Sequence, residues 1–247
     1  MLMLDLTDDQ LISLGLVVTL LVFSRAKDLL DISGILAATF TGLTVSLLGH
    51  WTWLVALFVF LVTGSLATKW KMEEKKALSL EEANEGLRGW RNVIANGGAV
   101  SLVAIYNFFY PGEEWIYLAA ISSISVALSD TLASEIGSLD LRTRSITNLQ
   151  SVPAGTNGGM SPTGTVAAFA GALIIGIVGV MFSPDDSTIS QINLLLLITI
   201  IGWLGCQVDS LLGALLENRG YLGKHSVNFL ATFSGVFMAL FFYSQLL

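Results

Sequence analysis

The 247-residue chain has little cysteine, histidine or charge, and each shortage argues against a class of protein. Its single cysteine, Cys206, excludes an intrachain disulfide framework, and the apolar run around it is typical of a small packed residue. Its two histidines, His50 and His225, stand alone, so no Cys/His cluster indicates a zinc site. Only 13% of the residues are charged, and no stretch resembles a nucleic-acid-binding module.

Long apolar runs dominate the sequence instead. Hydrophobic residues make up 53% of the chain, and the mean hydropathy is +0.73. The runs are about 18 to 22 residues long, enough for a helix to cross the hydrocarbon core of a bilayer. We predict an all-α, polytopic transmembrane helix bundle that forms a single domain over residues 1–247. The predicted spans are 9–23, 30–48, 51–67, 92–110, 115–136, 163–183, 191–216 and 225–245.

Basic residues are confined to alternate connections between the predicted spans. All twelve lysines and arginines fall in four loops, and the other loops and both ends of the chain have none. By the positive-inside rule these four loops are cytoplasmic, so both termini are predicted to be outside. The first span follows acidic residues and precedes no cleavage site, so we expect it to be retained. The acids assigned to the outer side are Asp5, Asp8, Asp9, Glu113, Glu114, Asp185 and Asp186.

Two acids lie near the cytoplasmic ends of apolar spans, where charge is costly and usually functional. Asp130 lies in "SDTLASEIGS" (129–138) and Asp209 in "VDSLLGALLEN" (208–218). Helical spacing puts Ser134 on the same stripe as Asp130, whereas Glu135 lies about 140° around the helix. The helix would therefore have to unwind for both acids to bind one ion. Two interpretations stay open: these acids bind a cation, or Asp130 and Asp209 only bond neighbouring helices.

The stretch "VPAGTNGGMSPTGT" (152–165) is unusual in such an apolar chain, because small, turn-forming and hydroxyl-bearing residues fill it. Its glycines permit a backbone whose N–H groups converge, and a helix predicted to begin at Thr163 adds its N-terminus. The stretch therefore suits an anion cradle. It is not a Walker A loop, because no lysine follows the glycines. Composition alone leaves a flexible loop equally open.

The stretch "TKWKMEEKKALSLEEANEGLRGWRNVIANGG" (68–98) has two halves of different character. The first half mixes lysine and glutamate at helical spacing, which predicts exposed side chains for Lys75 and Lys76. The second half sets Arg88 and Arg91, with two asparagines, at the start of a span, where they can hold phosphate oxygens. A simple positive-inside anchor is the alternative interpretation.

Together these features indicate phosphate chemistry at the membrane surface. Carboxylates suit a divalent cation, and arginines with a glycine-rich loop suit phosphates. Apolar helices suit an acceptor that is a lipid. We therefore expect loops 68–91 and 137–162 to form one nucleotide or phosphate site on the cytoplasmic side.

Four blocks of the chain resemble one integral-membrane family, from about Gly64 to Asn228. The family includes the phytyl-phosphate kinase of the vitamin E pathway and human transmembrane protein nineteen, and is more distantly similar to CTP-dependent phytol and dolichol kinases. The first two spans match it less clearly. The blocks are "ATKWKMEEKKALSLEEANEGLRGWRNVIANGG", "LSDTLASEIG", "ITNLQSVPAGTNGGMSPTGT" and "DSLLGALLE".

The resemblance implies a membrane kinase that converts an isoprenoid monophosphate, such as phytyl or geranylgeranyl phosphate, to the diphosphate. It implies a nucleoside triphosphate donor, with CTP favoured, and Mg²⁺ as cofactor. The expected partners are the isoprenoid phosphate and membrane lipids, with no nucleic acid, and a homo-oligomer stays open. Two other functions also stay open: a kinase of the free prenol, which would need a general base, and an anion or lipid transporter, suggested by similar stretches around Asp130 and Asp209.

Roles for particular residues follow from the same resemblance. The expected catalytic residues are Asp130, Asp209, Arg88 and Arg91. The expected metal ligands are Asp130, Glu135 and Asp209. The residues expected to bind the nucleotide are Ser134, Arg144, Asn148, Pro153, Gly155, Thr156, Asn157, Gly158, Gly159 and Ser161.

Overall fold

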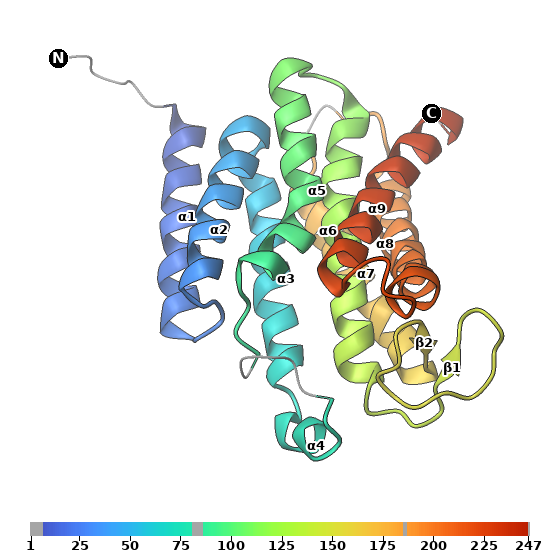
Figure 1. Cartoon of the computed structure of the whole chain (residues 1–247). Coiled ribbons are helices and arrows are strands. Elements are labelled where there is room, and N and C mark those ends of the chain that lie inside the picture. Colours follow the sequence, from blue (N-terminus) through green and yellow to red (C-terminus); the bar gives the residue numbers. More distant parts are fainter. Residues whose placement is uncertain (1–6, 81–85, 185–186, 247) are drawn as a thin grey trace.

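The computed structural model describes residues 7–80, 86–184 and 187–246. Three of the predicted outer acids, Asp5, Asp185 and Asp186, lie outside the described residues. Within the described chain, eight helices are long and apolar enough to cross a membrane, and they lie side by side as a bundle (Figure 1). The prediction of an all-α, polytopic bundle with eight spans is confirmed.

The observed spans match the predicted ones closely. The largest difference is at the end of the first span, predicted at residue 23 and observed at Ala26. The spans are α1 (Asp8–Ala26), α2 (Ile32–Thr44) continued by the π-helical η1 (Val45–Gly49), α3 (Trp51–Lys69), α5 (Trp90–Phe109), α6 (Glu114–Gly137), α7 (Pro162–Met181), α8 (Gln191–Leu212) continued by the π-helical η3 (Gly213–Glu217), and α9 (Lys224–Leu246). A short helix α4 (Met72–Ala77) and the strands β1 (Arg144–Ser145) and β2 (Gly159–Met160) complete the elements of the described chain.

Side-chain caps set the starts of several spans. Thr7 and Gln10 form a capping box at the start of α1. Asp31 caps α2 by accepting a hydrogen bond of 2.7 Å from the Gly34 N–H. Ser161 caps α7, where Pro162 occupies the first helical position. Each of these caps lies within two residues of the edge of the apolar run from which the span was predicted, so the predicted and observed starts are close.

The most deeply buried span is α6, which packs against α7, α8 and α9. Small residues allow its neighbours to approach closely: a Cβ on Gly171 of α7 would lie 2.9 Å from the Leu128 carbonyl oxygen of α6. Buried serines bond across these contacts, since Ser129 Oγ donates to the Ala168 carbonyl at 2.9 Å and Ser125 Oγ to that of Ile198 at 3.1 Å. The ends of α6, α7 and α8 are thereby held in a fixed arrangement.

Consecutive spans run in alternate directions, so their connections lie at two opposite faces. The connections α1–α2, α3–α5, α6–α7 and α8–α9, with the helix ends beside them, carry every lysine and arginine; we call this end of the bundle the basic face. The helix α4 and the β1–β2 hairpin also lie there (Figure 1). The location of the basic face in the cytoplasm stays a prediction of the positive-inside rule.

Candidate functional site

A cavity of about 360 Å³ at the basic face gathers most of the predicted site residues. Its volume lies in the range of small-molecule sites. Spans α3 and α5 to α9 contribute to its wall, and so do the loops 68–91 and 137–162. The predicted residues that line it are Arg88, Asp130, Ser134, Glu135, Gly155, Thr156, Asn157, Gly158, Gly159, Ser161 and Asp209.

Two acids meet in the inner part of this cavity, which we call the floor and define by Asp130, Cys206 and Asp209. Asp130 comes from α6 and Asp209 from α8, and their carboxylates are close enough to interact. Oδ1 of Asp209 is buried and has no hydrogen-bond partner among the described residues. The two helices approach closely because α8 has Gly202 beside Ser125. The floor therefore holds two adjacent carboxyl groups and one oxygen whose hydrogen-bonding capacity is unused.

Glu135 has a different environment, because a buried lysine neutralises it. Lys75 Nζ lies 2.6 Å from Glu135 Oε2, and Thr68 Oγ1 donates to Oε1 at 2.8 Å. The same ammonium donates to the Ala67 and Thr68 carbonyls at the end of α3, at 2.9 and 3.1 Å. The Lys75 side chain is 1% exposed. The prediction of an exposed Lys75 is therefore wrong, whereas Lys76 is exposed as predicted.

The predicted metal-ligand set of Asp130, Glu135 and Asp209 needs correction. Among the described residues, no group of three or more His, Cys, Asp or Glu side chains could hold a metal ion. Helix α6 runs without unwinding through both Asp130 and Glu135, so the two acids stay on different sides of it. Since both oxygens of Glu135 already have partners, only Asp130 and Asp209 stay as candidate ligands.

The glycine-rich stretch folds into a tight loop closed by β1 and β2, which pair antiparallel. Gly158 adopts a φ of +76°, and a Cβ there would lie 2.5 Å from the Ala214 Cβ, so only glycine lets the loop approach the end of α8. The bonds that the loop makes among its own backbone groups use the N–H of Thr156 and Gly159. None of them uses the N–H of Gly155, Asn157 or Gly158, within this described segment. These N–H groups are available to an anion.

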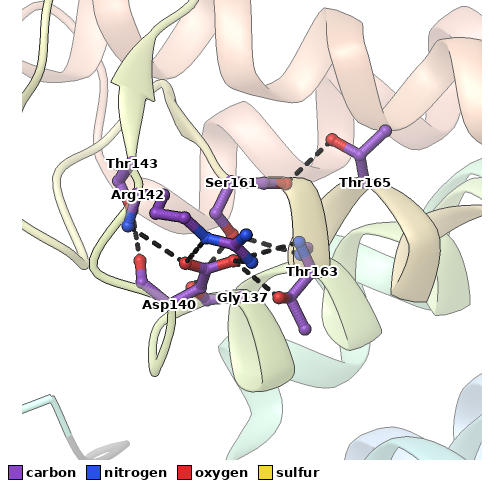
Figure 2. Close-up of polar contacts among 8 residues, drawn as sticks. Gly137, Asp140, Arg142, Thr143, Ser161, Thr163 and Thr165 are labelled. Carbon is purple, nitrogen blue, oxygen red and sulfur yellow. Dashed lines mark hydrogen bonds and ion pairs between the residues drawn. The ribbon is translucent and has the colours of Figure 1, made fainter.

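Asp140, in the turn that follows α6, fastens this turn to the start of α7, as Figure 2 shows. Its carboxylate accepts from Arg142 Nε and Nη2, both at 2.9 Å, and from Thr163 Oγ1 at 2.6 Å. The hydrogen bonds from Arg142, and then from Thr163, hold the pKa of Asp140 well below its ordinary value. The sequence interpretation missed this residue. Its signal was an aspartate two residues before an arginine in a turn, where Asp commonly accepts from the backbone.

Ser161 lines the cavity, but its hydroxyl has a structural role. Its Oγ accepts from the Gly164 N–H and donates to the Gly137 carbonyl, each at 3.1 Å. The hydroxyl therefore caps α7 and ties it to the end of α6 (Figure 2). The observed bonds show that Ser161 holds the start of α7 in place, and its binding to the nucleotide stays a prediction.

The backbone of Arg88 is held by the connection between α1 and α2. Its N–H donates to the Leu29 carbonyl at 3.1 Å, and its carbonyl accepts from the Asp31 N–H at 3.2 Å. Its guanidinium lies 5.0 Å from the Phe60 ring centre. It packs on α3 at Gly64, where a Cβ would lie 2.7 Å from Nη2. Arg88 is thus directed into the cavity by the α1–α2 connection and by α3.

Four predicted site residues do not line the cavity. Arg91 is exposed and lies over the Trp90 ring at 5.5 Å. Pro153 is exposed, and its carbonyl accepts from Thr156 Oγ1 at 2.7 Å. The other two stabilise the β1–β2 loop: Arg144 Nη1 donates to the Leu149 carbonyl at 3.0 Å, and Asn148 Oδ1 accepts from the Gln150 N–H at 3.0 Å.

The start of α9 contributes residues that the sequence interpretation missed. Lys224 and Asn228 line the cavity, and Lys224 interacts electrostatically with Asp209 and Glu217. The sequence signal was weak, because a lysine beside a span is ordinary under the positive-inside rule. Only the packing of α9 against α8 brings this ammonium near the floor.

Comparison with known proteins establishes the class of protein that this fold and site define. Residues 15–236 match the family described as integral membrane protein DUF92, and the chain belongs to that family. An uncharacterized membrane protein of Methanocaldococcus jannaschii is 33% identical over 236 residues, which cover 95% of this chain and 94% of that protein. The family membership inferred from the motifs is confirmed.

Two relatives come from Arabidopsis thaliana. Protein PGR is 28% identical over 218 residues, covering 80% of this chain and 75% of that protein. Protein VTE6, chloroplastic, is 33% identical over 157 residues, covering 56% of this chain and 47% of that protein. No solved structure matches the chain significantly.

Proposed function

We propose that the protein is a membrane kinase that transfers a phosphoryl group from a nucleoside triphosphate, with CTP favoured, to an isoprenoid monophosphate. The observation that carries the proposal is the cavity at the basic face, which brings Asp130, Asp209, Arg88 and the glycine-rich loop around one space. The motif resemblance to phytyl-phosphate kinases and the match to VTE6 support the isoprenoid acceptor.

The floor suits Mg²⁺ bound together with phosphates. Mg²⁺ in such sites uses one or two carboxylates and completes its shell with substrate oxygens and water. The buried, unpartnered Oδ1 of Asp209 and the adjacent Asp130 carboxylate fit this requirement. The ion would offset the repulsion between the two acids and neutralise charge on the transferred group.

The remaining walls suit polyphosphate and the acceptor. The N–H groups of Asn157 and Gly158 can donate to phosphate oxygens, and Lys224 adds positive charge near the floor. Arg88 reaches the same cavity from the opposite loop, and its fork geometry suits a phosphate monoester. In our proposal the glycine-rich loop orients the donor, and Arg88 orients the acceptor.

An acceptor that is already a phosphate is ionised at neutral pH, so its attacking oxygen needs no general base. Positioning and charge neutralisation then supply most of the rate. The floor is consistent with such a mechanism, because its two carboxylates suit a cation that neutralises charge, and neither is needed as a base.

Incubating the purified protein in nanodiscs with each labelled nucleoside triphosphate, against a panel of prenyl phosphates and prenols, tests donor and acceptor together. We expect transfer to a prenyl monophosphate that requires Mg²⁺. Transfer only to prenols would favour the prenol kinase. Counterflow of an anion or lipid in proteoliposomes without nucleotide consumption would favour a transporter and contradict the proposal.

A further inference from the structure

A second, smaller cavity lies on the other side of Arg88. It lies among α1, α2, α3 and α5, and most of the residues that line it are apolar, with leucine the commonest; they include Leu54, Leu57 and Phe60. Its volume is about 50 Å³, several times the about 10–15 Å³ that one water needs. A space of this size and character holds a few carbon atoms better than it holds water.

The two cavities meet at the same polar side chains. Arg88 and Asn92 line both of them. The only other polar residue that lines the small cavity is Thr41, within the described chain. A ligand that fits both spaces has an anionic group at Arg88 and a hydrocarbon chain that leads away from it.

We propose that the small cavity receives the first carbons of the acceptor's hydrocarbon chain, while Arg88 and Asn92 hold the phosphate to which they are attached. This inference rests on the proposed function, because it places the acceptor of that same site. The cavity is too small for a whole isoprenoid chain, so it selects for the carbons next to the phosphate. The first three spans then determine acceptor selectivity, and the phosphate-handling cavity lies mainly between the later ones.

The placement of Arg88 supports this division. The backbone of Arg88 is bonded to the α1–α2 connection, and its guanidinium packs on Phe60, which also lines the small cavity. Arg88, which holds the phosphate, and the cavity wall, which contacts the hydrocarbon chain of the acceptor, are therefore packed against each other. A change in the wall alters where the phosphate lies as well as how the chain fits.

Binding of small probes tests the inference without requiring turnover. We measure the dissociation constants of inorganic phosphate and of n-butyl phosphate by competition on the protein in nanodiscs. Their ratio reports how much the butyl chain contributes to binding. Ala38→Leu fills the cavity and is expected to reduce that ratio about tenfold, the effect of about two buried methylene groups. Ala170→Leu, an exposed position on α7 that lines neither cavity, is the matched control and should leave the ratio unchanged.

Leu57→Ala provides a second variant with the opposite change of volume. It enlarges the cavity and should raise the preference for branched isopentyl phosphate over n-butyl phosphate. An unchanged ratio in Ala38→Leu, or an unchanged preference in Leu57→Ala should Ala38→Leu fail to fold, would overturn the inference. A ratio that responds as expected in a protein that transfers no phosphoryl group would instead refute the proposed function and keep the cavity assignment.

Discussion

Two pairs of acids at the basic face differ in their surroundings: Asp140 and Glu135, which we call the rim, and Asp130 and Asp209 of the cavity floor. At the rim, Asp140 accepts from two residues and Glu135 pairs with buried Lys75. At the floor, Asp209 lies against Asp130, and its Oδ1 has no partner among the described residues. All four acids lie near the ends of spans or in a loop of the basic face, so their position along the chain does not separate them.

The difference indicates how these acids divide between structure and function. A carboxylate whose oxygens are fully bonded within the protein stabilises the fold and has little capacity left for a ligand. A buried carboxylate beside a second acid lowers the stability of the fold, so its presence indicates that it binds a cation or a substrate. Rim and floor variants should therefore affect stability and activity in opposite ways.

The largest effect is expected at the floor. Asp130→Asn and Asp209→Asn each remove a candidate metal ligand, so phosphoryl transfer should fall by about 10² to 10³-fold at saturating Mg²⁺. Thermal stability should stay the same or rise, because each change relieves the repulsion between the acids. Glu113→Gln, exposed at the opposite face, is the control for both measurements. Full activity in Asp130→Asn would disprove the metal assignment.

The next largest effect is expected at the rim, on stability. Lys75→Met leaves the Glu135 carboxylate buried without its counter-charge, which should lower the free energy of unfolding by about 3–5 kcal/mol. Lys76→Met changes the neighbouring, exposed lysine and should have almost no effect. Reversible unfolding in detergent or bicelles measures both. Equal effects of the two substitutions would contradict the buried pair, and a Lys75→Met/Glu135→Leu double variant should recover part of the loss.

A smaller effect is expected for the arginines of the 68–91 loop. Arg88→Lys keeps the charge but loses the fork, so the KM for the prenyl phosphate should rise about tenfold with a smaller change in kcat. Arg91→Lys should change neither constant, because Arg91 lies outside the cavity on Trp90. Steady-state kinetics with varied acceptor separates the two. A larger effect from Arg91→Lys would restore the original sequence prediction for that residue.

The smallest effect is expected for Asp140→Asn, which weakens the bonds that hold the turn after α6 to Arg142 and to the start of α7. The pKa of Asp140 is lowered in the folded state, so its contribution to stability is present above its ordinary pKa and is lost as the pH falls below that value. The variant should unfold a few degrees lower at neutral pH, and this difference should shrink in acid. Asp28→Asn, at an exposed surface pair, serves as control. A difference that persists in acid would show that the charge of Asp140 is unimportant.

Much of the fold could be predicted because its signals are local. Apolar run length, capping residues such as Thr7 and Asp31, and turn residues between spans all act over a few positions. The alternation of basic and non-basic loops supported the number of spans, because a wrong number would have broken the alternation. The same local reasoning identified Asp130 and Asp209, because a charge within an apolar run is costly wherever that run packs.

Local reasoning was wrong where a side chain finds a distant partner. Lys75 lies in a lysine- and glutamate-rich segment that is typical of a solvated helix, but its partner is Glu135, sixty residues along the chain. Arg91 and Arg144 have the same residue type as Arg88, and only the path of the backbone separates the residue inside the cavity from those outside it. The contribution of Lys224 likewise depends on how α9 packs.

The sequence by itself determined that the chain is a bundle of eight membrane-crossing helices, where each span begins and ends to within about three residues, and which residue types are chemically able to handle phosphate. These properties follow from hydrophobicity and hydrogen bonding within a few residues of each position. The tertiary structure alone decided which acids are neutralised and which face each other, and which basic side chains reach the cavity. The physical reason is that the interaction of a charge depends on the distance and burial of its partners, and packing brings those partners from remote parts of the chain.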